Sequence, residues 1–124
     1  KEITVYLEKP TDIFNCIKDI DKIEQRYGCT EEGCFYIPPR DVFFAVDCSK
    51  DRLGRAESLF DAAAKKINID HHITNAEGTG DVNYVIPDAS SASELVCNLI
   101  EDEYMGVDIA MALYIGMIQD TGGF

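Results

Sequence analysis

A chain of 124 residues is long enough to bury one hydrophobic core but short for two separately stable domains, so we expect a single domain. With 46% hydrophobic and 10% aromatic residues, the composition excludes an intrinsically disordered protein. Its 23 acidic residues against 11 basic ones give a net charge of −12, which argues against binding of long duplex nucleic acid through a broad basic surface.

The cellular setting predicted from the sequence is the cytoplasm, without a membrane partner. No apolar run approaches the roughly 18–20 residues of a membrane span, and the first residues lack the zones of a signal peptide. Five cysteines, an odd number, argue against a disulfide framework and for reduced thiols. Cys29 and Cys34 are the only close pair, so a structural zinc protein ranks last among the functional classes.

The first half of the chain predicts strand, helix, strand and helix. Residues 3–8, ITVYLE, have the alternation and β-branched content of a strand, and apolar spacing predicts a helix over 11–24. A polar link over 28–34 follows. DVFFAVD (41–47), apolar between its two aspartates, predicts a strand covered on both faces. RLGRAESLFDAAAKK (52–66) predicts the second helix.

The second half predicts two strands and then two helices. INID (67–70) indicates a short buried strand and DVNYVI (81–86) an alternating one. Helical spacing continues over 89–104, and 107–120 is apolar on nearly all sides, which predicts a buried helix. This order favours a layered α/β domain with a largely parallel sheet flanked by helices.

Polar residues that can carry chemistry follow two of these strands. One strand ends on Asp47, and the next ends on Asp70, which is followed at once by His71 and His72, the only histidines of the chain. In parallel α/β sheets, ligands bind at the carboxyl ends of the strands. If the two strands are neighbours, Asp47 and His71 lie at one edge of the sheet, within reach of one ion.

Asp120 is the third candidate ligand. It ends the apolar helix, where a carboxylate meets the negative end of the helix dipole at a cost of roughly 0.3–1 kcal/mol, and a bound cation would reverse that cost. Asp47, His71 and Asp120 therefore predict a site for a divalent ion such as Mn²⁺. The alternative is that both aspartates merely form turns. Two histidines directly after an aspartate are harder to explain by packing.

Four segments resemble the DHH phosphoesterases, a family that includes RecJ-type exonucleases, nano-RNase/pAp-phosphatase-type oligoribonucleases, cyclic-dinucleotide phosphodiesterases and family II pyrophosphatases. They are AVDCSKDRLGR, INIDHHITN, NYVIPDASSASELV and ALYIGMIQDTGGF, and they run in the family's order from about residue 42 to the last residue. The wording of DASSASEL and QDTGGF is most similar to the oligoribonuclease/pAp-phosphatase branch.

The resemblance implies that Asp47 bridges two metal ions, usually Mn²⁺ with Mg²⁺ or Co²⁺ as alternatives, and that His71 and Asp120 ligate one of them. His72 would contact the substrate phosphate or the attacking oxygen, and Asp70 would orient the histidines. The implied reaction is two-metal hydrolysis with in-line attack on phosphorus. The implied substrates are short oligoribonucleotides or 3′,5′-bisphosphorylated nucleotides. A cyclic-dinucleotide phosphodiesterase and a non-catalytic nucleotide-binding module of the same fold are the alternatives.

The resemblance also has gaps. Family members begin with a loop of the form H-x-x-P-D-x-D and continue beyond TGGF into a smaller substrate-binding domain, and neither is found here. Residues 1–124 are therefore expected to form a partial DHH domain, catalytically incomplete and inclined to form homo-oligomers. The only D-x-D, at Asp19 and Asp21, falls in the predicted helix, where the two side chains point apart, so it predicts surface charge.

Each of four further residues can be explained either by a functional role or by an ordinary structural role. Arg52 and Arg55 are candidates for a phosphate contact, but surface charge is at least as good an explanation for both. Ser90 and Ser91 could bind an anion at a helix N-terminus. The spacing of Ser91 and Glu94 is that of a capping box, which favours capping over catalysis.

Overall fold

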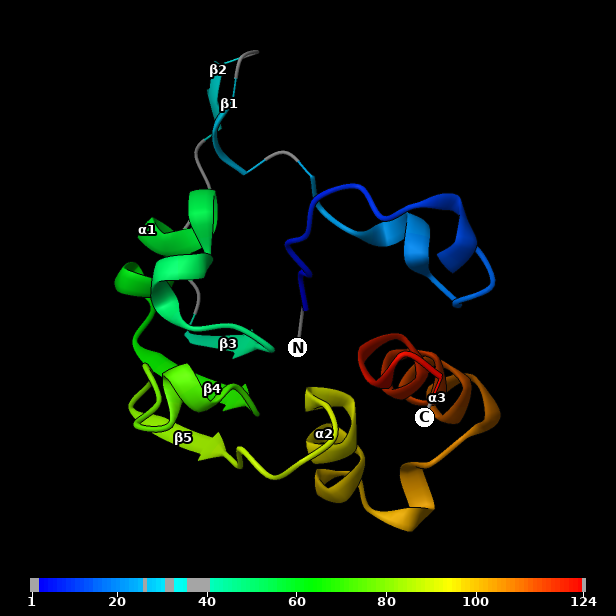
Figure 1. Cartoon of the computed structure of the whole chain (residues 1–124). Helices are drawn as coiled ribbons and strands as arrows, with labels where there is room; N and C mark the ends of the chain where they lie inside the picture. The colour runs from blue at the N-terminus through cyan, green and yellow to red at the C-terminus, as the bar shows by residue number, and fades with distance from the viewer. Residues whose placement is uncertain (1–2, 26, 31–32, 36–40, 124) are drawn as a thin grey trace.

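The computed structural model describes residues 3–25, 27–30, 33–35 and 41–123, and it contains a three-stranded parallel sheet. The strands β3 (Val42–Val46), β4 (Lys65–Asp70) and β5 (Val82–Val85) follow one another in the order β3-β4-β5. Figure 1 shows the three arrows side by side and pointing the same way. The α/β class predicted from the alternation of elements is confirmed.

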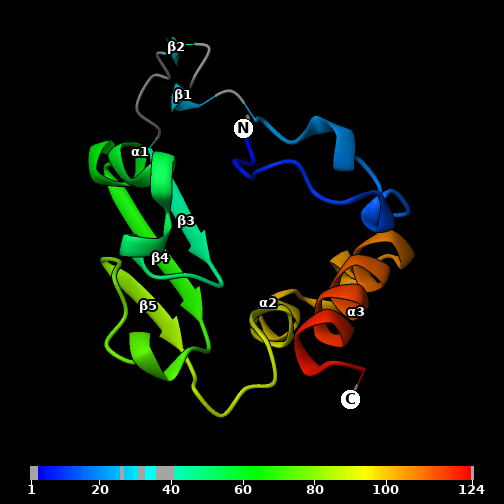
Figure 2. The same ribbon diagram turned by 45° about the horizontal axis from the view of Figure 1, so that its top comes forward.

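Three α-helices accompany the sheet: α1 (Glu57–Ala62), α2 (Ala92–Leu99) and α3 (Val107–Thr121). Helix α1 packs on β3, α2 packs on β4, and Figure 2 shows α2 and α3 lying beside one another. The two helices approach closely at Gly116, where an added Cβ would meet the Ser93 hydroxyl. Among the described residues, no helix combines the length and apolarity needed to cross a membrane.

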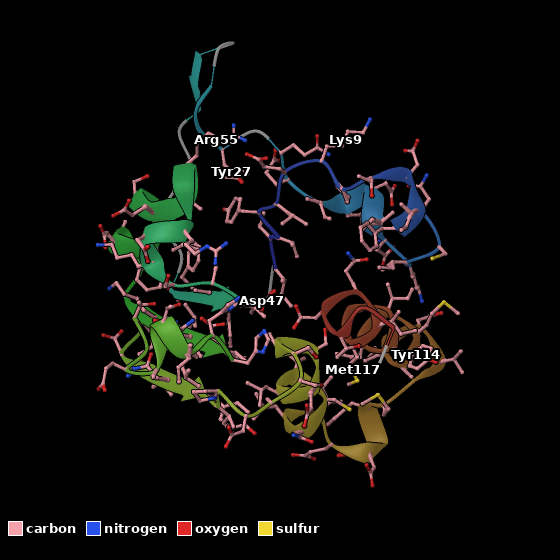
Figure 3. All side chains as sticks on the ribbon, viewed as in Figure 1. Lys9, Tyr27, Asp47, Arg55, Tyr114 and Met117 are labelled. Atoms are coloured by element: carbon pink, nitrogen blue, oxygen red, sulfur yellow. The ribbon has the colours of Figure 1, made fainter. Side chains whose placement is uncertain are left out.

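The core lies between β3 and α1. Phe43 and Ala45 of β3 point into it, and Phe60 of α1 is 1% exposed. The rings of Phe43 and Phe60 meet edge to face at 5.4 Å, the geometry that aromatic pairs prefer. Tyr27 completes this core and carries the Arg55 guanidinium 4.6 Å above its ring, as the two labels in Figure 3 show. Arg55 is therefore partly buried against the core, whereas the sequence predicted either a surface charge or a phosphate contact.

The prediction for the N-terminal segment is wrong. Residues 3–8 contribute only a single parallel bridge between Tyr6 and Glu24, and the helix predicted over 11–24 is replaced by two short 3₁₀ helices, Asp12–Phe14 and Ile20–Lys22. Asp19 adopts a left-handed backbone conformation with φ 62°, which interrupts an α-helix. The Asp19 carboxylate, 2.7 Å from the Lys22 ammonium, is exposed, as expected for surface charge.

Other boundaries also differ from the prediction. The helix predicted over 89–104 is reduced to α2, because the backbone at Ile100 is already extended. The polar link over 28–34 forms an antiparallel hairpin of β1 (Gly28–Thr30) and β2 (Gly33–Phe35), in which Cys29 lies opposite Cys34 in the register. The helix predicted over 52–66 is reduced to α1, because Gly54 has φ 53° and the backbone at Ala63 is already extended. Lys65 and Lys66 belong to β4 instead.

Burial of β3 and α3 is also less complete than predicted. The strand predicted over 41–47 is present, but its exposure alternates, and Val42, Phe44 and Val46 are 40–57% exposed. Helix α3 forms as predicted but has no buried residue in the part of the chain that the structure describes, and Tyr114 is 57% exposed. The apolar composition of β3 and α3 predicted burial on all sides, but one face of β3 and much of α3 are exposed.

Gly80 marks a tight approach between backbones beside β4. A Cβ on Gly80 would lie 2.9–3.0 Å from three backbone atoms: the carbonyl oxygens of Lys66 and Val82 and the amide nitrogen of Asn68. We expect Gly80→Ala to lower the free energy of unfolding by about 1–3 kcal/mol, since backbone cannot rotate away as a side chain can. Urea denaturation measures this loss. Gly106→Ala, which no atom approaches within 4 Å, is the control, and an equal loss there would contradict the steric explanation.

Candidate metal centre

The site is built where β3 and β4 end. Val46 pairs with Ile69 in the parallel register, so Asp47 and Asp70 leave the sheet at the same edge. The Asp47 backbone N–H donates to the Ile69 carbonyl at 2.9 Å, which attaches the turn after β3 to β4. Figure 3 labels Asp47 just beyond the end of β3, toward α2 and α3. The parallel sheet thus brings together residues that are far apart in the sequence.

His71 lies at the centre of the site. Its Nε2 atom is 3.4 Å from Asp47 Oδ1 and 3.0 Å from Asp120 Oδ2. Its Nδ1 atom is 3.2 Å from the Ala89 carbonyl oxygen, which can only accept a hydrogen bond, so Nδ1 carries the proton. In the neutral ring, Nε2 then presents a lone pair to two carboxylates. This buried Nε2 atom has no hydrogen-bond partner, and a positive charge between the three groups, on a bound cation or on the ring itself, would stabilise the arrangement.

Asp120 reaches this site from the last turn of α3. Gly122, with φ 66°, ends the helix in the left-handed conformation that glycine adopts without strain. Among the residues that the structure describes, the group whose possible ligand atoms all lie within 4.8 Å of one another is Asp47, His71 and His72. Asp120 adjoins this group through His71. His71 thus contacts both predicted carboxylate ligands, but the close group contains His72 in place of Asp120. The predicted set of metal ligands stays a prediction.

The electrostatics of Asp47 favour a cation. Partial burial raises its pKa, and repulsion from Asp120 raises it further. A carboxylate that is half desolvated and faces a second carboxylate is stabilised by a nearby positive charge. Oxygen and imidazole ligands together suit hard or borderline divalent ions such as Mn²⁺. The donor set of this chain therefore fits the metal that the sequence motif implies.

Asp70 is fully buried and is saturated with hydrogen bonds. Its Oδ1 atom accepts from His72 Nδ1 at 2.7 Å and from the backbone N–H groups of His71 and His72, at 2.8 and 3.2 Å. Its Oδ2 atom accepts from Asn75 Nδ2 at 2.7 Å. Although burial opposes ionisation, the bonds from His72 and Asn75 outweigh it and lower the pKa of Asp70. Both oxygens of the Asp70 carboxylate are thus occupied by neighbouring protein donors.

The His72 ring is partly exposed to solvent, and its Nδ1 atom is hydrogen-bonded to the buried Asp70 carboxylate. The hydrogen bond to Asp70 raises the pKa of His72, and the Asp47 carboxylate adds to the effect. Because Nδ1 is held by Asp70, Nε2 is the atom left to contact a ligand. The His72 side chain is 37% exposed, and its protonated form, which the raised pKa favours, can donate a hydrogen bond to an anionic group.

Sequence reasoning missed two residues of the site, Asn68 and Asn75. Asn68 is fully buried in β4, and Asn75 follows the histidines in a short 3₁₀ helix, Ile73–Asn75. The only signal was an asparagine between Ile67 and Ile69, a polar amide in an apolar run. Such a residue needs hydrogen-bond partners when buried, and their positions cannot be read from a single sequence.

The remaining candidates lie outside this cluster or cap a helix. Arg52 is exposed in the 3₁₀ helix Lys50–Arg52. The Ser91 hydroxyl caps α2 by accepting from the Glu94 backbone N–H at 3.2 Å, so the capping prediction is confirmed. The Glu94 carboxylate bonds to Ser90 rather than to the Ser91 backbone, and this bond lowers the pKa of Glu94. A phosphate contact by these residues stays a prediction.

Comparison with known proteins gives a family and a fold. A family model described as "DHH family, N-terminal domain" matches residues 9–117. The crystal structure of an exopolyphosphatase-related protein from Bacteroides fragilis is similar with a TM-score of 0.74 and 23% sequence identity, over 98% of this chain and 37% of that one. The chain therefore spans well under half of that protein's length. No curated protein matches.

Proposed function

Because the chain belongs to the DHH family, we propose that it carries the catalytic metal site of a phosphoesterase that hydrolyses phosphodiester or phosphomonoester bonds. The observation that carries this proposal is His71 Nε2, a buried lone pair 3.4 and 3.0 Å from two carboxylate oxygens without a hydrogen bond. A structural role for three such groups leaves their mutual repulsion unexplained, whereas a divalent cation removes it.

In this proposal, Asp47, His71 and Asp120 hold Mn²⁺, with Mg²⁺ or Co²⁺ as alternatives. Bound ions of this kind supply a nucleophile at neutral pH and neutralise charge that develops on the phosphoryl oxygens. Since Asp70 keeps the His72 ring in place and favours its protonated form, His72 donates a hydrogen bond to a phosphoryl oxygen of the substrate. Asp70 contacts neither metal nor substrate in this proposal, and its hydrogen bonds fix the positions of both histidines.

We propose short oligoribonucleotides and 3′,5′-bisphosphorylated nucleotides such as pAp as the substrates. A chain with a net charge of −12 repels a long polyanion over its whole surface, whereas a small substrate meets mainly the local field of the metal site. Cyclic dinucleotides are the alternative substrate. The exopolyphosphatase-related neighbour adds inorganic polyphosphate to the compounds worth assaying.

The test is hydrolysis by the full-length protein with Mn²⁺, on pAp, di- to pentaribonucleotides, cyclic dinucleotides and polyphosphate. We expect turnover of pAp and short RNA, and its loss in the double variant Asp70→Ala/His71→Ala. Asp88→Ala, at an exposed carboxylate one residue before the Ala89 carbonyl that holds His71, is the control and should leave turnover unchanged. Turnover of only cyclic dinucleotides or polyphosphate would reject the substrate class. Binding of Mn²⁺ and nucleotide without any turnover would indicate a non-catalytic module.

A further inference from the structure

The Asn68 side chain, near the carboxyl end of the central strand β4, is bonded at both ends of its amide, although no step of the proposed reaction uses it. It is fully buried in β4, one strand away from Asp47 and two residues before Asp70. Its carboxamide has donors at one atom and an acceptor at the other, and both ends are occupied. A buried amide with every partner present is costly to replace, because the groups it leaves behind cannot reach water.

The donor end of Asn68 holds the turn that carries Asp47. Its Nδ2 atom donates to the Ala45 carbonyl at 3.1 Å and to the Cys48 carbonyl at 3.0 Å, the two carbonyls that flank the turn. Between them, Asp47 has φ 62°, a left-handed conformation that a residue with a Cβ adopts at a cost of order 1 kcal/mol. Such a conformation persists where the surroundings fix it, and here one carboxamide bonds the chain on both sides.

The acceptor end of Asn68 holds the loop after the histidines. Its Oδ1 atom accepts from Asn75 Nδ2 at 2.8 Å and from the Thr79 backbone N–H at 3.2 Å. The same Nδ2 atom of Asn75 donates to Asp70 Oδ2 at 2.7 Å. A continuous chain of hydrogen bonds therefore runs from the Asp47 turn through Asn68 and Asn75 to Asp70, and from there to His72.

We propose that Asn68 is a positioning residue for the metal site: its buried carboxamide fixes the Asp47 turn relative to the Asp70 and histidine side of the site. This inference rests on the proposed metal site, but the geometry it concerns belongs to the protein itself. Asparagine suits the position because it offers two donors and an acceptor without charge. Aspartate would lose both donors and add a second buried charge near Asp70, and an aliphatic residue would lose every bond.

The first test measures Mn²⁺ affinity of Asn68→Ala by isothermal titration calorimetry. Loss of a group that orients metal ligands typically lowers affinity about 10–100-fold, and we expect a decrease in that range. Asn98→Ala, the same change at an exposed position of α2, is the matched control and should leave the affinity unchanged. Equal affinity in Asn68→Ala and the unchanged protein would overturn the proposal.

The second test needs no metal and separates this inference from the proposed function. The Asp47 N–H, bonded to the Ile69 carbonyl, should exchange with deuterium at least about tenfold faster in Asn68→Ala, because its turn opens locally. The Lys65 N–H, bonded to the Asp41 carbonyl at the far end of β4, contacts none of the Asn68 partners and should keep its rate. If the unchanged protein binds no Mn²⁺, the proposed function fails while this measurement still decides the role of Asn68.

A variant at Asn75, the amide bonded to Asn68, keeps the proposal testable if Asn68→Ala does not fold. If Asn68→Ala fails to fold, Asn75→Ala breaks the same chain of hydrogen bonds from its loop side while leaving the strand intact. We then expect a weaker effect at Asp47, a shift of the His72 ring resonances and lower Mn²⁺ affinity. Unchanged His72 resonances and unchanged affinity in a folded Asn75→Ala variant would overturn the proposal.

Discussion

His71→Ala is expected to lower the Mn²⁺ affinity by more than about 100-fold, beyond the range typical of residues that only support ligands. His72→Ala, which removes the adjacent ring of the same type, should change the affinity by less than about tenfold and should instead reduce turnover. Both affinities can be measured by calorimetry, and electron paramagnetic resonance of Mn²⁺ can count the bound ions.

The difference between the two histidines follows from their hydrogen bonds. The protonated Nδ1 atom of His71 faces the Ala89 carbonyl, so its Nε2 lone pair points at Asp47 and Asp120. His72 instead directs Nδ1 to the Asp70 carboxylate, 2.7 Å away, and this bond favours its protonated form. In its protonated form an imidazole has no lone pair for a metal, but it can donate a hydrogen bond to a phosphate.

The outcome that contradicts this assignment is specific. If His72→Ala loses as much Mn²⁺ affinity as His71→Ala, both rings are ligands and Asp70 is a partner that raises ligand basicity. If neither variant changes the affinity, the cluster of Asp47, His71 and Asp120 holds no Mn²⁺ at all. Circular dichroism of both variants should match the unchanged protein, since the two rings are only partly buried.

The part of the site that the sequence predicted depends on local signals and one rule of topology. Short apolar runs identified β3 and β4, and their last residues were Asp47 and Asp70. In a parallel sheet these ends lie at one edge, and the pairing of β3 with β4, which the sequence left open, brings Asp47 to His71. Asp120 was predicted as a further ligand because it lies at the end of the apolar helix, shortly before two glycines, and α3 does end there.

The part that the sequence missed depends on contacts between distant residues. Nothing in the pattern around Asn68 indicates that its amide reaches the Ala45 and Cys48 carbonyls of another strand. The N-terminal segment failed for a related reason: its helical spacing was real, but Ile13 is 68% exposed, so the spacing does not correspond to a buried face. Amphipathic patterns stabilise a helix mainly through what they pack against.

The same limit applies to β3, whose apolar residues on both faces predicted a strand covered on both sides. The structure buries Phe43 and Ala45, on the side of α1, and leaves Phe44 57% exposed on the other side. A run of apolar residues shows that a face can be buried, and only the arrangement of the other elements shows that it is. Two phenylalanines near one another can therefore have very different effects on stability.

We expect Phe60→Ala to lower the free energy of unfolding by about 3–5 kcal/mol, the range measured when a buried phenylalanine is truncated and a cavity remains. Phe60 is 1% exposed and contacts the Phe43 ring edge to face, so truncation removes both apolar burial and an aromatic pair. Phe44→Ala, the same change at an exposed ring, should cost less than about 1 kcal/mol.

Urea denaturation followed by circular dichroism measures both losses through the transition midpoint at constant slope. A matched pair of phenylalanines makes the comparison independent of the chemistry of the substitution, so the difference between the two losses reports burial. If Phe44→Ala costs as much as Phe60→Ala, the outer face of β3 is covered in solution, and the strand is buried on both faces as its sequence predicted. If only Phe60→Ala is costly, the stabilising core lies on the α1 side of β3.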